Sequence, residues 1–212
     1  MSRIAKIALV LMTASLLINP ALAVDPPEDL GYGVLGIYTE PAATPEAQTY
    51  LEGITPGTIH TVYFVLYHAN LTSYNLGGFE FSWRVEPAEM TPNVVGMEWG
   101  IGEDLALNFG DEFNLLVGHA RRDPHAPDEP FVLFSADLLF LETPGNAAVF
   151  LGPSVPDSIE DEMAYADFVF PEELHVMKPN NAGQTLGDPV FFFNPTVATE
   201  QTSLTEIKAL FD

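Results

Sequence analysis

The stretch YNLGGFEFSWRVEP, residues 74–87, decides the fold class. Two glycines open it, a proline closes it, and apolar and polar side chains alternate in between. Such alternation predicts a β-strand with one buried face and one wet face. The apolar row is Phe79, Phe81, Trp83 and Val85, and the polar row is Glu80, Ser82, Arg84 and Glu86. We interpret the apolar row as part of the core, so any binding platform is to be sought elsewhere.

The preceding segment, IHTVYFVLYH at 59–68, is dense in β-branched and aromatic residues, which favour strands. It is apolar on both faces, so we expect a strand that is central or covered on its outer side. The same reading predicts further strands at 31–38, 93–99, 113–120, 131–142, 147–151, 163–170 and 187–195.

About eight short strands separated by turn signals predict an all-β domain, a two-sheet antiparallel β-sandwich of Ig-like or jelly-roll type. A closed barrel is the alternative, but the unequal strands and irregular connections favour the sandwich. One short helix is expected at 202–212, where Ser203 and Glu206 form a capping box. Its apolar stripe consists of Leu204, Ile207, Leu210 and Phe211.

The first 23 residues have the pattern of a signal peptide. Arg3 and Lys6 precede an apolar run of 12 residues at 7–18, shorter than the roughly 20 that span a bilayer. Cleavage is expected after Ala23, which makes the protein secreted or periplasmic with no membrane span in the mature chain. A flexible acidic lead-in would occupy 24–30, the β-sandwich domain 31–201 and the helix 202–212.

The chain is strongly acidic, with 30 Asp and Glu against seven Lys and Arg. Removal of the signal peptide takes two basic residues and no acidic one, so the formal charge falls from −23 to −25. Nucleic acid and anionic membrane surfaces are poor partners for such a surface. The absence of cysteine excludes disulfides, thiolate metal sites and cysteine nucleophiles.

The sequence contains no motif of an enzyme class. It has no HExxH, no G-x-S-x-G, no phosphate-binding loop and no dinucleotide fingerprint. Paired acids such as Asp111 with Glu112 are adjacent in sequence, whereas glycosidases need two carboxyls that face each other across a cleft. We therefore assign no catalytic residue and expect no enzyme.

Calcium is the one cofactor that the acidic loops leave open, although we expect none. Carboxylate oxygens on loops are the ligands that Ca²⁺ prefers. The candidates are Asp104, Asp111, Glu112, Asp157 and Asp161. These residues lie in two segments, 102–112 and 156–167, and neither has the residue order of a calcium-binding loop. Dispersed acidic residues also keep a protein soluble.

Exposed aromatic rings are the other candidate site, because sugar C–H faces stack on coplanar rings. The candidate residues are Tyr63, Tyr67, Tyr74 and Trp99. The alternative is that these rings fill the core or lie under a covered outer face, which is the commoner use of aromatic residues in strands.

Two motifs carry a resemblance to known proteins. GFEFSWRVEP at 78–87 and FVLFSADLLFLE at 131–142 resemble strands of cohesin-like and related carbohydrate-binding β-sandwiches. Over nearly the whole chain, GGFEFSW, FLGPSVPDSIEDEMAYAD and the terminal IKALF resemble uncharacterised secreted bacterial proteins. The resemblance implies a cohesin-like sandwich and brings no known activity.

These observations lead to a hypothesis about function. We expect a secreted, non-catalytic β-sandwich that binds or scaffolds at the bacterial cell surface or outside it, with a protein or a polysaccharide as ligand. One alternative is a structural subunit of an extracellular assembly that docks by its C-terminal helix. Another is a secreted hydrolase that uses acidic loop residues. The oligomeric state is left open.

Overall fold

The computed structural model describes residues 31–41, 48–100, 106–119, 129–181 and 183–195, and these form an all-β fold, as predicted. The one helix described is a single 3-10 turn, η1, at Ala88–Met90. No helix in these ranges has the length and apolar character to cross a membrane. The strands are β1 Gly33–Tyr38, β2 Tyr50–Leu51, β3 Ile59–Tyr67, β4 Leu76–Glu86, β5 Asn93–Trp99, β6 Ala106–Asn108, β7 Asn114–His119, β8 Phe131–Leu139, β9 Ala147–Gly152, β10 Met163–Asp167, β11 Leu174–Pro179 and β12 Phe191–Phe193.

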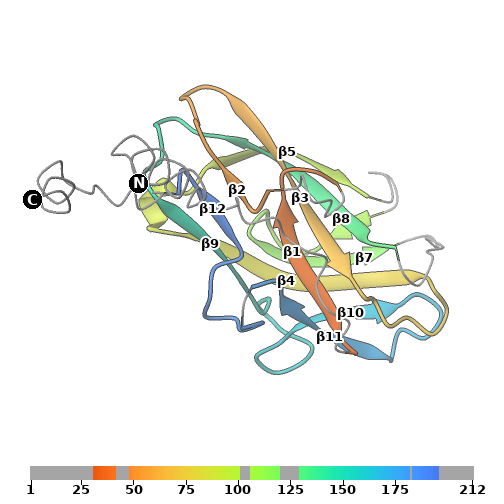
Figure 1. The fold of residues 1–212 in the computed structure, drawn as a ribbon. Coiled ribbons are helices and arrows are strands. Elements are labelled where there is room, and N and C mark those ends of the chain that lie inside the picture. The colour runs from red at the N-terminus through yellow and green to blue at the C-terminus, as the bar shows by residue number, and fades with distance from the viewer. Residues whose placement is uncertain (1–30, 42–47, 101–105, 120–128, 182, 196–212) are drawn as a thin grey trace, which may run out of the picture.

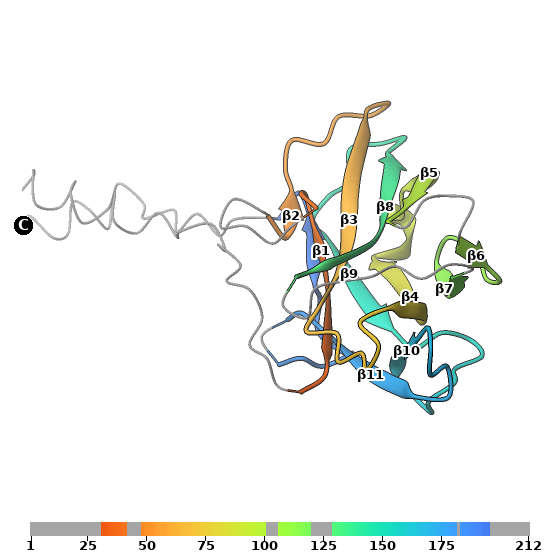
Figure 2. The same ribbon diagram turned by 90° about the vertical axis from the view of Figure 1, so that its right-hand side faces the viewer.

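Hydrogen bonds join the strands into one continuous path, in the order β2-β12-β9-β4-β10-β11-β1-β3-β8-β5. β7 adds to the free side of β4, and β6 adds to β7. Figure 2 shows β1, β3 and β8 side by side, with β4, β7 and β6 on the other side of the molecule. The predicted division into two separate sheets is not confirmed, because β10 and β11 link both parts of the path (Figure 1).

Two strand pairs correct the expectation of purely antiparallel pairing. β1 runs parallel to β11, with Gly33 opposite Met177 and Leu35 opposite Pro179. β12 runs parallel to the short β2. Parallel pairs need long crossover connections, and here the segments that separate the partners span most of the chain.

The apolar row of the opening stretch lies in the core, as the alternation predicts. Phe79, Phe81, Trp83 and Val85 are all buried. Phe81 packs on Phe64 of β3, with ring centroids 5.8 Å apart, so β4 and β3 face each other across the core. The Trp83 indole N–H donates to the backbone carbonyl of Glu112 at 2.6 Å, which satisfies its polar atom within the core.

The second apolar face of β3 is covered, one of the two outcomes expected from its sequence. Val65 and Tyr67 pack with Val34 and Tyr38 of β1 in a small cluster separate from the main core. The Tyr38 and Tyr67 rings meet edge to face at 6.0 Å. Burial raises the pKa of Tyr38 far above its ordinary value, although a hydrogen bond from Asn180 acts in the other direction.

Other predicted segments either lie outside the described residues or differ in their bounds from the strands of the structure. The signal peptide, the lead-in at 24–30 and the C-terminal helix at 202–212 lie outside the described residues. The segment 174–179 forms β11, which the sequence does not announce, and the expected strands at 163–170 and 187–195 are shorter as β10 and β12. Tyr50 and Leu51 form the short strand β2, which lies outside the predicted strands.

Candidate functional site

The candidate site lies on the outer face of β4, where two strands share one of its edges. β9 pairs with β4 from Ser82 to Glu86, and β10 pairs with it from Leu76 to Glu80. β9 and β10 thus follow one another along a single edge and are separated by the segment 153–162. We call this segment the strap.

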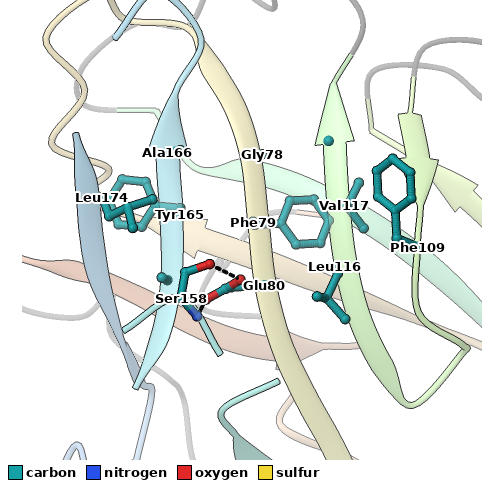
Figure 3. A pocket seen from close by; sticks show the side chains of 12 residues that line it. Gly78, Phe79, Glu80, Phe109, Leu116, Val117, Ser158, Tyr165, Ala166 and Leu174 are labelled. Carbon is teal, nitrogen blue, oxygen red and sulfur yellow. Dashed lines mark hydrogen bonds between the residues drawn. The ribbon is translucent and has the colours of Figure 1, made fainter. Parts of the chain in front are cut away.

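Three polar contacts fasten the strap to neighbouring strands. The Asn114 side chain on β7 donates to the Val155 carbonyl at 2.9 Å and accepts from the Val155 N–H at 2.8 Å. The Glu80 carboxylate on β4 accepts from the Ser158 N–H at 2.6 Å and from its hydroxyl at 2.8 Å (Figure 3). At the end of the strap, Lys178 on β11 donates to both carboxylate oxygens of Glu162 at 2.6 Å. Each of the three contacts supplies two hydrogen bonds, so the strap is held at three points.

A row of small residues crosses the sheet next to the strap. Strand register places five residues side by side on β11, β10, β4, β7 and β6: Leu174, Ala166, Gly78, Gly118 and Leu107. The three middle positions carry at most one methyl group, whereas the two leucines at the ends are exposed. The row therefore forms a low floor between two apolar walls.

This floor and its walls enclose a groove of about 240 Å³. Leu116 and Phe109 extend the wall on the β7 side, and the Phe109 side chain is 76% exposed. Glu80 and Ser158 provide polar groups at the strap (Figure 3). An exposed phenylalanine in one wall of the groove and an exposed leucine in the opposite wall form an apolar surface patch, which indicates an interaction site.

The floor rests on rigid core residues. A Cβ at Gly78 would lie 2.6 Å from the Val117 carbonyl oxygen, so only glycine lets β4 and β7 approach this closely. Beneath it, the Tyr165 hydroxyl accepts the Asn70 backbone N–H at 2.8 Å. Burial raises the pKa of Tyr165, against the effect of that hydrogen bond, so the phenol is neutral near pH 7.

The structure does not bring the four candidate platform aromatics together. Tyr63 and Tyr67 lie on the outer face of β3, and Tyr67 is buried in the small cluster. Trp99 packs on Phe134 of the main core, with centroids 5.5 Å apart. Tyr74 is exposed in the turn before β4. These rings come from three different surroundings and form no common surface.

The candidate calcium ligands within the described residues are engaged in local turns. Asp111 accepts the backbone N–H groups of Phe113 and Asn114, at 2.8 and 2.7 Å. Asp157 accepts the Asp161 N–H at 2.8 Å within the strap. Glu112 is exposed, and Asp104 lies outside the described residues. In the part of the chain that the structure describes, no three His, Cys, Asp or Glu side chains gather as a metal site.

The groove was missed at the sequence level. Its residues come from four strands, the strap and the turn after β6, between positions 78 and 174, and their proximity depends on strand register. The available signal was glycine inside strands, at Gly77, Gly78 and Gly118, because such glycines mark close backbone approach or a site for a ligand.

Comparison with solved structures finds cohesins. The sixth cohesin of Acetivibrio cellulolyticus scaffoldin B, solved in complex with a Cel5 dockerin mutant, is 12% identical with a TM-score of 0.42, over 77% of this chain and 99% of its own. A non-cellulosomal cohesin from the hyperthermophilic archaeon Archaeoglobus fulgidus is 12% identical with a TM-score of 0.40, over 68% of this chain and 86% of its own. No protein-family model matches, and no curated protein matches the sequence. Function has to be argued from this chain's own residues.

Proposed function

We propose that the protein is a secreted, non-catalytic binding module that docks a protein partner in the groove on the outer face of β7, β4 and β10. The observation that carries the proposal is the cross-strand row in which Ala166, Gly78 and Gly118 form a floor between exposed leucines. Protein partners insert large apolar side chains into such hollows as binding anchors.

Shape and chemistry both favour a protein over a polysaccharide. The groove walls are Phe109, Leu116 and Leu174, which supply apolar contact but little hydrogen bonding. Both oxygens of Glu80 already accept hydrogen bonds from Ser158. A sugar needs many polar partners in addition to a stacking ring, whereas an apolar side chain of a protein needs only the walls and floor.

Position-specific photocrosslinking tests this proposal. A photoreactive phenylalanine analogue is placed at Phe109 in the groove wall or, as a matched control, at Leu141, an exposed apolar residue after β8. Each variant is produced in the cells from which the gene comes, and adducts are identified by mass spectrometry. We expect a protein adduct from position 109 that is absent from position 141.

Two results would overturn the proposal. One is the same set of adducts from both positions, which would mean that the groove selects nothing. The other is no protein adduct from position 109 together with binding on a glycan array, which would make a polysaccharide the ligand. The array is run on the mature chain with and without calcium, so that it also tests for a metal requirement.

A further inference from the structure

The charge around the groove restricts what can dock there. Carboxylates are close in sequence to lining residues on three sides of the groove: Asp157 and Glu160 flank Ser158 in the strap, Glu172 and Glu173 precede Leu174, and Asp111 and Glu112 follow Phe109. Glu80 lines the groove itself. A partner with acidic residues around its anchor would meet like charges at each of these sides.

Positive charge within the described residues is already neutralised. These residues contain two basic side chains, Arg84 and Lys178. Arg84 pairs with Glu86 at 3.0 Å, and Lys178 pairs with Glu162 at 2.6 Å. The segment 120–128, which follows β7, has two arginines and two aspartates in its sequence and adds no net charge.

From the apolar floor and the acidic surroundings together, we infer that the partner presents a large apolar side chain flanked by Lys or Arg. This inference rests on the proposed function and names the chemistry of its partner. The apolar side chain would lie over Gly78 and Gly118, and the flanking cations would face the strap and the Glu172–Glu173 pair. The long-range field of an acidic protein also accelerates the approach of a cationic partner.

The same charges disfavour the chain's own C-terminal segment as the occupant. That segment, 202–212, has an apolar stripe of suitable type but carries Glu206 and Asp212 against one lysine, Lys208. Its net charge has the sign of the groove surroundings. We therefore do not expect the chain to self-assemble through this segment, and the experiment below distinguishes self-assembly from binding of another protein.

Gly118 provides a variant that fills the groove without disturbing the strands. A Cβ there would meet one atom within 4 Å, the Phe109 ring at 3.8 Å. Gly118→Val therefore adds bulk to the floor while the backbone stays in place. Gly187→Val is the matched control, because nothing lies within 4 Å of a Cβ at that loop position. Leu174→Ser, in the opposite wall, is a second variant in case Gly118→Val fails to fold.

The probes are three helical peptides of equal length, each bound to the full mature chain and followed by fluorescence anisotropy. One has a leucine stripe with lysines, one a leucine stripe with glutamines, and one an alanine stripe with lysines. We expect the leucine–lysine peptide to bind about tenfold more tightly than either other peptide at about 50 mM salt. Its affinity should fall several-fold at about 300 mM salt, because the charges are screened. Gly118→Val and Leu174→Ser should each weaken this binding about tenfold, whereas Gly187→Val should not.

The other outcomes separate the two proposals. If the leucine–glutamine peptide binds as tightly and is lost in Gly118→Val, the groove docks proteins but the inferred charge of the partner is wrong. Equal binding of both lysine peptides, or equal binding by Gly118→Val and the parent, would mean that the peptides bind through non-specific charge attraction and not through the groove. Either result would overturn the inference. Absence of any peptide binding would overturn it as well, and photocrosslinking at position 109 would then decide the proposed function alone. A dimer that disappears on deletion of 202–212 would identify the chain's own segment as the occupant.

Discussion

The Glu80 carboxylate on β4 accepts hydrogen bonds from the backbone N–H and the hydroxyl of Ser158, 78 residues further along the chain. Both bonds are charge-assisted, which makes them stronger than bonds between neutral groups. They fix the strap at the polar side of the groove, so the shape of the candidate site depends on this contact.

Loss of the strap contacts should loosen the strap without unfolding the domain. Glu80→Ala and Asn114→Ala each remove the partner of two hydrogen bonds. We expect faster amide hydrogen exchange in peptides covering 153–162, and a decrease of about 1 kcal/mol in the free energy of unfolding. Glu98→Ala, at an exposed position of β5, is the control. Unchanged exchange in the strap would show that these contacts do not hold it.

The two faces of β4 should respond very differently to truncation. Phe81 is fully buried among Phe64, Phe79 and Phe134, so Phe81→Ala should lower the free energy of unfolding by about 3–5 kcal/mol. Arg84, on the outer face, is about half exposed and pairs with Glu86, and Arg84→Ala should lower it by less than about 1 kcal/mol. Urea unfolding measures both, and similar losses would contradict the assignment of the two faces.

Asp167 should make stability depend on acid pH. Its buried carboxylate accepts the Ser73 N–H and hydroxyl at 2.6 Å each, as well as the N–H groups of Val169 and Phe170. Burial acts to raise the pKa of Asp167, but these hydrogen bonds together lower it below its ordinary value. Ionisation of the Asp167 carboxyl group therefore stabilises the folded state.

The sign of that pH effect follows from linkage. Because the folded-state pKa of Asp167 is lowered, its stabilisation is present above the unfolded-state pKa of about 3.9 and is lost as the pH falls through the folded-state value. Asp167→Asn should lower the free energy of unfolding by about 2–3 kcal/mol at neutral pH and by less at acid pH. Thermal unfolding from pH 7 downward measures this, and a pH-independent difference between variant and parent would refute it.

Substitution by alanine should destabilise the protein at Gly78 but hardly at Gly118, although the two glycines are paired in the groove floor. Gly78→Ala places a Cβ against the Val117 carbonyl and should destabilise the protein by about 2 kcal/mol or more, because backbone has to move. Gly118→Ala meets only the edge of Phe109 and should change stability by less than about 0.5 kcal/mol. Denaturant midpoints of the two variants give the comparison, and equal effects would mean that β4 and β7 are not in close approach.

Sequence reasoning predicted the elements whose pattern is local. The stretch 74–87 alternates with a period of two, and the run at 59–68 is apolar on both faces and dense in β-branched and aromatic residues. Both form strands with the expected faces. β11 was not predicted because LHVMKP does not sustain such a pattern and ends in a lysine and a proline. It pairs on one side with β10, the preceding strand, and on the other side with β1, about 140 residues earlier, and the second pairing is encoded by no local pattern.

The candidate site could not be predicted for the same reason. Gly78 and Gly118 are 40 positions apart in the sequence, and no local pattern in either segment predicts that they lie opposite each other on β4 and β7. The aromatic candidates were chosen by residue type, and strand register distributes them over separate surroundings. Charge was the property of the site that the sequence did indicate, because the excess of acids is so large that any surface of this chain is expected to be acidic.

The in-line arrangement of β9 and β10 has a consequence for how such proteins can diverge. Each strand is anchored to β4 by its own backbone ladder, so both would stay in place if the ten residues between them changed in length or composition. Substitutions and insertions could accumulate there under selection for new partners, while the strands that carry stability are left untouched. Descendants of one ancestral chain could in this way acquire different binding preferences from a single hypervariable segment.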